Sequence, residues 1–371
     1  MLASDLSVRH GGVFPLKHLQ YVRNKLALRA ERATNDVARF WHRLRVLAVD
    51  KSTLRLPETR ELWRKFRSHR NMHGENNLAA EMCTLFSVAA QIPLKYVVGR
   101  SYTSEFALIK KLFRYLKKGD LLLLDNGFYS FNVFQSLNSR CCHFIIPASV
   151  ALRPKVLQRL GTDDFLAEIK DSKSGETMTV RVVYAYRKGF RRRRLVTSLL
   201  APEQYPAVDI CQLYHWRWSI ETFFRDFKSG MESINWHCKT VHSFNLELCS
   251  HMLTATLVRM VMCESGKKRG RRTWEVSFSK ALIEVRLFFN RILRRGTGTL
   301  AQLLADTVEM CSRFLVDIRP GRSFLREKHK YRSKARGIDK KRGRPRKLAK
   351  PIDERGKECI LSFRDGDYLL N

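Results

Sequence analysis

The segment "DLLLLDNGFYS" contains an uninterrupted apolar run, Leu121–Leu124, that stops abruptly at Asp125. A short run of this kind, bounded by turn-forming residues, is typical of a central strand that is buried on both faces. A second segment, "LRVLAVDKSTLRLP", has a similar pattern, which predicts a buried strand ending at Asp50, a tight turn and then another strand. Together these strands predict an α/β fold with a sheet that is covered on both sides.

Changes of pattern along the rest of the chain divide it into five regions. Strands and helices alternate after a helical start, strand-like segments then dominate, and helical patterns return after Glu203. The stretch from Arg319 to Lys350 holds 15 Lys or Arg in 32 residues without periodicity, which predicts a disordered basic arm. The predicted regions are a short helical N-terminal region (1–43), the first part of a mixed-sheet domain (44–146), a β-rich insertion (147–202), a helical part (203–318) and a basic tail (319–371).

Within the mixed-sheet domain, the patterns predict three more strands and two helices. The strands are "LAAEMCTLFSVAA", "PLKYVVGR" and "CCHFIIPAS", and the helices are "SEFALIKKLFRYLKKGD" and "FYSFNVFQSLNSR".

The strongly basic composition indicates what kind of partner the protein binds. The chain has 371 residues, 70 of them Lys or Arg against 35 Asp or Glu, which gives a formal net charge of +35. Such a bias predicts a polyanionic partner, with nucleic acid favoured over an anionic membrane surface. The best apolar window, Met252 to Cys263, is too short to span a bilayer and contains Arg259. Nine Cys without a CxxC pair predict reduced thiols in the cytoplasm.

One helical segment, "YHWRWSIETFFRDFK", carries an acidic residue among cations. At about 100° per residue, its four residues Tyr214, Arg217, Glu221 and Lys228 fall within about 60° of one another, while Trp and Phe residues form a separate, core-facing stripe. A solvated helix face with favourable i,i+4 pairs would explain this line by itself. It would not explain Asp50 and Asp125.

The two strand-end aspartates and the helical glutamate suggest a shared task. Each Asp taken alone could cap a following turn. Taken together, Asp50, Asp125 and Glu221 are three carboxylates that could hold two divalent cations about 4 Å apart for phosphodiester chemistry. All-oxygen ligands suit Mg2+, two ions in this case, with Mn2+ as a substitute. The neighbouring Tyr, Arg and Lys side chains would then hold DNA phosphates.

At this point the sequence resembles the DDE transposases of the IS-4-like group (insertion-sequence family four). Their signature Tyr-x2-Arg-x3-Glu-x6-Lys is matched at every position, and the segments around Asp50 and Asp125 resemble those around the family's two aspartates, so that the likeness covers Leu44 to Cys263. The resemblance implies an RNase H-like mixed sheet with a β insertion before the final Glu. It implies a synaptic dimer or higher multimer that cuts the ends of a transposon and joins them to double-stranded target DNA, without a membrane. It also places the protein in the prokaryotic cytoplasm, associated with the nucleoid.

Several positions depart from the family pattern. Lys51 stands where the family usually has Gly, and it would either crowd the turn or add a phosphate contact. Only 49 residues precede Asp50, and no Trp lies in the insertion to hold a flipped base. In the tail, Arg342 and Arg344 lie in an Arg-Gly-Arg-Pro sequence that resembles an AT-hook, although non-specific phosphate binding is favoured. A DNA-binding protein without catalysis and an RNase H-like nuclease without strand transfer therefore stay open as alternatives.

Overall fold

The computed structural model describes residues 15–34, 40–70, 76–148, 152–172, 174–185, 192–231, 235–295 and 300–316. The predicted basic tail, with Arg342 and Arg344, lies outside these residues. The strands are β1 (Phe40–Trp41), β2 (Leu44–Arg55), β3 (Ser68–Arg70), β4 (Asn76–Ser87), β5 (Ile92–Arg100), β6 (Asp120–Leu124), β7 (His143–Pro147), β8 (Lys155–Gly161), β9 (Asp164–Lys170), β10 (Thr177–Ala185) and β11 (Arg193–Thr197). The helices are α2 (Leu16–Ala33), α4 (Arg60–Phe66), α5 (Glu105–Leu112), α6 (Phe131–Asn138), α7 (Ala207–His215), α8 (Trp218–Arg225), α9 (Val241–Lys268), α10 (Phe278–Arg295) and α11 (Leu300–Ser312).

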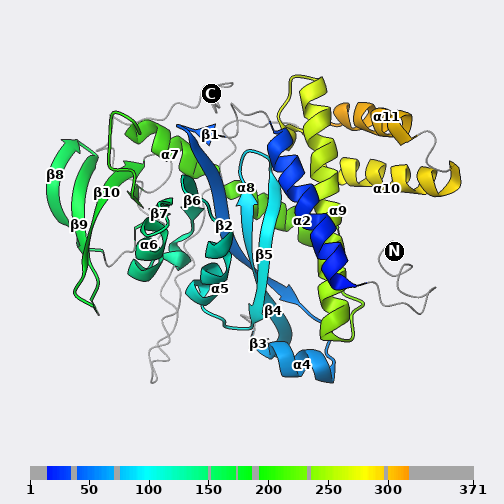
Figure 1. The fold of residues 1–371 in the computed structure, drawn as a ribbon, viewed down its shortest axis with the longest axis horizontal. Helices are drawn as coiled ribbons and strands as arrows, with labels where there is room; N and C mark the ends of the chain where they lie inside the picture. The colour runs from blue at the N-terminus through cyan, green and yellow to red at the C-terminus, as the bar shows by residue number, and fades with distance from the viewer. Residues whose placement is uncertain are drawn as a thin grey trace, which may run out of the picture.

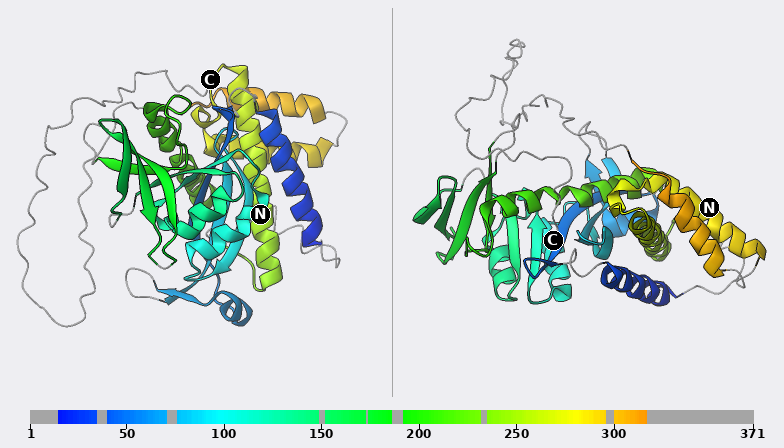
Figure 2. Two further views of the ribbon diagram at one scale, coloured as in Figure 1. Left: turned by 60° about the vertical axis from the view of Figure 1, so that its left-hand side comes forward. Right: turned by 90° about the horizontal axis from the view of Figure 1, so that it is seen from above.

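A single mixed sheet forms the centre of the described part of the chain (Figure 1). Its order is β3-β4-β2-β6-β7-β11-β10-β9-β8, with β5 beside β4 and β1 beside β2. Strands β2, β6 and β7 are parallel neighbours, and the other pairs are antiparallel. The prediction of a mixed sheet with flanking helices is confirmed. The strand-rich segment after β7 continues the same sheet, so that β8 to β10 lie at one end of the molecule and α10 and α11 at the other (Figures 1 and 2).

The sheet separates two apolar cores because side chains alternate along each strand. On β2, Val46 and Ala48 join one core with residues of α7, α8 and α9. Leu47 and Val49, one residue out of phase, join the other core with residues of α5 and α6. The leucine run of β6 is buried along its whole length and contributes to both cores, as the sequence predicts for a central strand.

The N-terminal region differs from the predicted short helical region (1–43), because its described part is not helical throughout. Helix α2 ends at Ala33, and Phe40 and Trp41 form the short strand β1, which pairs with the start of β2. The two residues between these strands, His42 and Arg43, have φ values of 46° and 66°. Positive φ at both positions is the geometry of a tight hairpin turn, and no Asn-Gly or Asp-Gly pair marks it in the sequence.

The prediction that a strand ends at Asp50 and a tight turn follows is wrong. Strand β2 runs without interruption from Leu44 to Arg55, and Asp50 lies inside it. The parallel partner β6 does stop there, since the last pair of that ladder is Val49 with Leu124. The antiparallel partner β4 accompanies β2 as far as Arg55, and its backbone hydrogen bonds keep the strand extended.

The segment predicted as one regular helix over 214–228 is also divided. Bonds from Trp216 N to Leu213 O and from Arg217 N to Tyr214 O span three residues, so the chain tightens between α7 and α8. After α8 the chain widens into a π-helical turn, Asp226–Gly230. The helical direction is kept, but the even spacing assumed for the four signature residues is not.

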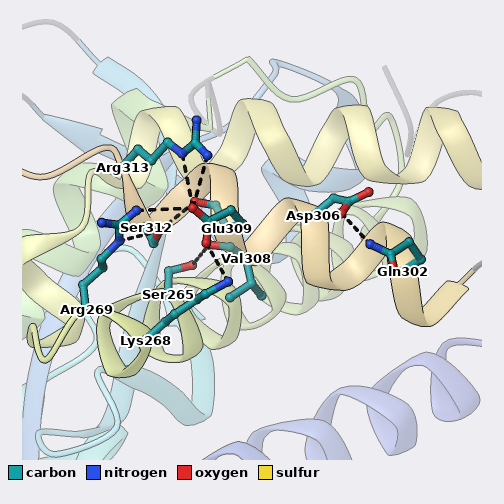
Figure 3. A network of polar contacts seen from close by, with 9 residues as sticks. All are labelled: Ser265, Lys268, Arg269, Gln302, Asp306, Val308, Glu309, Ser312 and Arg313. Carbon is teal, nitrogen blue, oxygen red and sulfur yellow. Dashed lines mark hydrogen bonds and ion pairs between the residues drawn. The ribbon is translucent and has the colours of Figure 1, made fainter.

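Helix α9 is the longest described helix, and by length and mean hydropathy it could cross a membrane. In this structure it packs instead against α2, α10 and α11 and against β5, with Arg259 buried in its second half. At its C-terminal end the carboxylate of Glu309 on α11 accepts contacts from Lys268, Arg269 and Arg313 (Figure 3). These pairs are solvent-exposed and contribute little, so burial of apolar residues holds α11 in place.

Candidate active site

The register of the parallel strands brings the two aspartates together. Val49 of β2 lies opposite Leu124 of β6 as the last pair of their ladder, so the residues that follow, Asp50 and Asp125, occupy neighbouring positions at the same edge. The Asp50 side chain is largely buried, whereas that of Asp125 is about half exposed. The structure therefore brings these two residues, which are far apart in the sequence, to one edge of the sheet.

Glu221 approaches the same edge from α8, and Arg217 lies among the three carboxylates. The guanidinium NH2 of Arg217 is 2.5 Å from Glu221 Oε1 and 3.9 Å from Asp125 Oδ1, and NH1 is 3.6 Å from Asp50 Oδ2. The Arg217 side chain is only 5% exposed. Its Nε and NH1 atoms have no hydrogen-bond partner among the described residues. One buried cation therefore balances part of the charge of three carboxylates, while two of its donor atoms are enclosed without a hydrogen-bond partner in the described part of the chain.

The remaining signature residues lie in different environments. Tyr214 is buried, and its hydroxyl donates to the carbonyl oxygen of Leu124 at 3.0 Å, immediately before Asp125. Lys228 is half-buried in the π-helical turn. Burial lowers the pKa of Lys228, and the nearby carboxylates of Glu81 and Asp50 partly offset that effect. Tyr214 thus contacts the backbone beside the site, while Lys228 lies at the edge of the acidic cluster.

Lys51 lies on the opposite face of β2 from Asp50 because successive side chains on a strand alternate. Its Nζ is 3.8 Å from Glu81 Oε2 and 3.7 Å from Glu105 Oε1. A Cβ atom on Gly127 would lie 2.0 Å from Glu105 Oε2, so a larger residue at this position, two residues after Asp125, would require the end of the Glu105 side chain to move. Lys51 therefore crowds no turn, and through Glu105 it connects the segments that carry the two aspartates. Sequence reasoning did not find Glu81 and Glu105, because nothing local in the sequence marks their pairing with Lys51.

The donor set fits a hard divalent cation. Asp50, Asp125 and Glu221 offer only carboxylate oxygens, the donors that Mg2+ prefers. Among the described residues, no three acidic, His or Cys side chains are already placed around one ion position. The guanidinium of Arg217 lies between the carboxylates instead, so binding of a metal ion there requires Arg217 to release some of its contacts.

Comparison with known proteins identifies the family. Residues 41–257, more than half of the chain, match the family model "Transposase DDE domain". The chain belongs to this family. It is 25% identical over 302 residues to "Transposase InsG for insertion sequence element IS4" of Escherichia coli (strain K12), and the match covers 77% of this chain and 68% of that protein. The predicted resemblance to the IS4-like DDE transposases is confirmed.

A solved structure is also similar over part of its length. The cryo-EM structure of the piggyBac transposase synaptic complex with hairpin DNA matches with a TM-score of 0.41 and 13% sequence identity. The match covers 75% of this transposase and 59% of the piggyBac chain.

The electrostatics of the site are most visible at Asp50. The pKa of Asp50 is raised to about 6, mainly by burial, and the neighbouring Asp125 and Glu221 contribute in the same direction. The hydrogen bond from Lys51 N to Asp50 Oδ1, at 2.7 Å, and the charge of Arg217 act in the opposite direction. Ionised Asp50 in this transposase is thus disfavoured chiefly by burial and to a lesser degree by the two neighbouring carboxylates.

A test of this unfavourable ionisation is the stability of Asp50→Asn in metal-free buffer. Because the folded pKa of about 6 lies above the ordinary value of 3.8, the folded state binds more protons between these pH values, and stability falls as pH rises through that window. A difference of this size corresponds to about 3 kcal/mol at most. We expect the variant and the parent to have the same melting temperature near pH 4, and the variant to have the higher melting temperature at pH 7. A variant that melts at or below the parent at pH 7 would contradict the burial of an ionised Asp50.

Proposed function

We propose that this transposase cuts DNA at the ends of an insertion sequence and joins those ends to target DNA, by phosphodiester hydrolysis followed by transesterification at Asp50, Asp125 and Glu221. The observation that carries the proposal is the convergence of the three carboxylates around Arg217, at the edge where two parallel strands meet. A stable fold has no need of three acidic groups there, since ionised groups at a buried strand edge require partners.

The side chains around the carboxylates have separable roles. Asp50, Asp125 and Glu221 would hold two Mg2+ ions, and the metal would supply activation of the attacking hydroxyl and stabilisation of the leaving oxygen. Arg217 and Lys228 would bind phosphates of the DNA strand near the carboxylates. Tyr214 positions the segment of Asp125 through its hydrogen bond to Leu124, which is a revision of its predicted contact with DNA.

The wider assignments rest on the same family membership. We infer an RNase H-like arrangement for β2, β4, β5, β6 and β7, with 147–202 as an insertion before the helix of Glu221 and 203–318 completing the domain. The substrate is double-stranded DNA, both transposon ends and target, and two or more copies of the chain act together. We infer a location in the prokaryotic cytoplasm, at the nucleoid, because the proposed substrate is DNA.

Incubation of the purified protein with DNA that carries the flanking ends of its element tests the proposal. With Mg2+ or Mn2+ we expect nicks at the ends and joined products, and with EDTA neither. Nicks without joined products would favour the nuclease alternative. Metal-independent DNA binding without any nick would favour a DNA-binding protein that lacks catalysis.

A further prediction concerns the basic tail. Deletion of 319–371 removes at least the 15 Lys or Arg between Arg319 and Lys350. We expect weaker non-specific DNA binding and a flatter dependence of log K on log salt, because each phosphate that the protein no longer neutralises reduces the slope by about 0.9. Titration of a fluorescent duplex at several salt concentrations measures the slope. The same slope with and without the tail would show that the tail does not touch DNA.

A further inference from the structure

The π-helical turn Asp226–Gly230 carries Lys228 at its centre. The N–H of Met231 donates to the carbonyl oxygen of Asp226 at 3.0 Å, a bond across five residues that accommodates one more residue than an α-helical turn. Turns of this kind occur frequently at functional sites. Lys228 Nζ forms no hydrogen bond or ion pair with another described residue. Among the described residues, the backbone turn is therefore the part of the structure that sets where this side chain begins.

A buried ion pair fixes the first residue of the turn. Arg259 of α9 donates from NH2 to Asp226 Oδ2 at 2.8 Å. The Arg259 side chain is 2% exposed, and its guanidinium carbon lies 5.9, 5.5 and 5.5 Å from the ring centroids of Phe86, Phe223 and Phe278. Its Nε atom has no hydrogen-bond partner among the described residues. An arginine enclosed in this way depends on Asp226 for its charge balance, and Asp226 is held where Arg259 can reach it.

The last residue of the turn packs on one of the same aromatic rings. A Cβ atom on Gly230 would lie 3.3 Å from the ring of Phe278, so the backbone there already packs closely on α10. Phe227, beside Lys228, is fully buried in the core. Both ends of the turn are thus fixed on α9 and α10, and Lys228 between them lies within the electrostatic influence of Glu81 and Asp50.

We propose that Asp226 and Arg259 are positioning residues for the reaction: their buried ion pair holds the π-helical turn and thereby directs Lys228 to the phosphate of the DNA strand that is cut. The substrate in this statement rests on the proposed function. The positioning of Lys228 does not, because it can be measured on the free protein.

The first experiment measures the acetylation rate of each lysine by mass spectrometry, with N-hydroxysuccinimidyl acetate as the probe and no DNA present. Loss of the ion pair in Arg259→Met should free the turn and speed acetylation of Lys228 by at least about fivefold, while Lys155 on the distant strand β8 reacts as before. Met262→Ala, a truncation in the same helix at another buried position, is the control for general loss of stability. If Lys228 reacts at the parental rate in Arg259→Met, the proposal is overturned.

The second experiment is a double-mutant cycle on single-turnover DNA cleavage. Misplacement of a reacting group by about 1 Å can cost on the order of a hundredfold in rate, and we expect a loss of that order in Arg259→Met and in Lys228→Ala. In the double variant the two losses of cleavage rate should not multiply, because both changes act on the same positioned amine. We expect its rate to be less than about threefold below that of Lys228→Ala alone. Multiplied losses would instead give Arg259 a purely structural role.

Two further outcomes are decisive. Should Arg259→Met fail to fold, Asp226→Asn replaces it in both experiments, since it weakens the ion pair without changing the side-chain volume. Should the parent fail to cut DNA at all, the proposed function is wrong, while the acetylation rates still decide whether the ion pair positions Lys228.

Discussion

Asp125→Asn should abolish DNA cleavage in the presence of Mg2+ while leaving the fold and the affinity for DNA intact. The amide keeps the shape of the side chain but is a poor ligand for a hard cation. Replacing a residue that only hydrogen-bonds to a metal ligand already lowers metal affinity or activity by about 10–100-fold. Replacing a direct ligand should therefore lower the single-turnover rate by more than about 100-fold. Because the Asp125 side chain is about half exposed, the melting temperature should change little.

The affinity of this variant for DNA should equal or exceed that of the parent, since one negative charge has been removed from a surface that meets phosphates. Asp306→Asn, the same chemical change at an exposed residue of α11 that accepts a hydrogen bond from Gln302 (Figure 3), is the matched control and should cut at the parental rate. Cleavage by Asp125→Asn at the parental rate would remove Asp125 from the set of metal ligands.

Arg217→Ala should destabilise the metal-free protein at neutral pH and make its stability depend on Mg2+. The substitution leaves Asp50, Asp125 and Glu221 without the cation that they share. Breaking a buried ion pair costs about 3–5 kcal/mol. Glu221 and Asp125 are partly solvated here, so we expect about 2 kcal/mol, measured by denaturant unfolding at pH 7.5.

Two dependences separate this explanation from a simple packing defect. The destabilisation should shrink below about pH 6, where Asp50 takes up a proton. Added Mg2+ should raise the melting temperature of Arg217→Ala more than that of the parent, because the metal ion no longer competes with the guanidinium. Arg217→Lys restores the charge without the planar guanidinium group. Its rise in melting temperature on addition of Mg2+ should lie between that of the parent and that of Arg217→Ala. Equal Mg2+ responses in parent and variant would show that Arg217 does not compete with the metal ion.

The elements that local patterns specify were predicted well. The leucine run of β6 is followed by turn residues, and both signals lie within a few residues of each other, so strand and boundary are readable without the fold. The end of β2 was not readable in this way. Its length depends on β4, a partner that the chain reaches only after α4 and β3, and no residue near Asp50 indicates that pairing.

The site shows the same division. The predicted strand-end positions of Asp50 and Asp125, with Glu221 on a helix, indicated carboxylates with a common task, and the ladder of β2 and β6 explains why the two aspartates lie close together. The position of Arg217 among them depends on tertiary structure, as does the hydrogen bond from Tyr214 to Leu124. The backbone tightens before α8 and widens into a π-helical turn after it, but neither change is marked by a Pro or by a Gly before the last residue of the turn. The sequence therefore predicted one regular helix, which is inaccurate.

The continuity of the sheet through β11 has a consequence for aggregation. Residues Leu195 to Thr197 of β11 form a ladder with Ile145 to Pro147 of β7, which covers the edge of an almost entirely apolar strand. A chain shortened by the segment 147–202 would expose that edge, and unpaired, apolar edge strands recruit strands of other molecules. In this protein the strand-rich segment is thus a protective cover for the central strands, so the soluble yield of such a deletion would suffer before its activity could be measured.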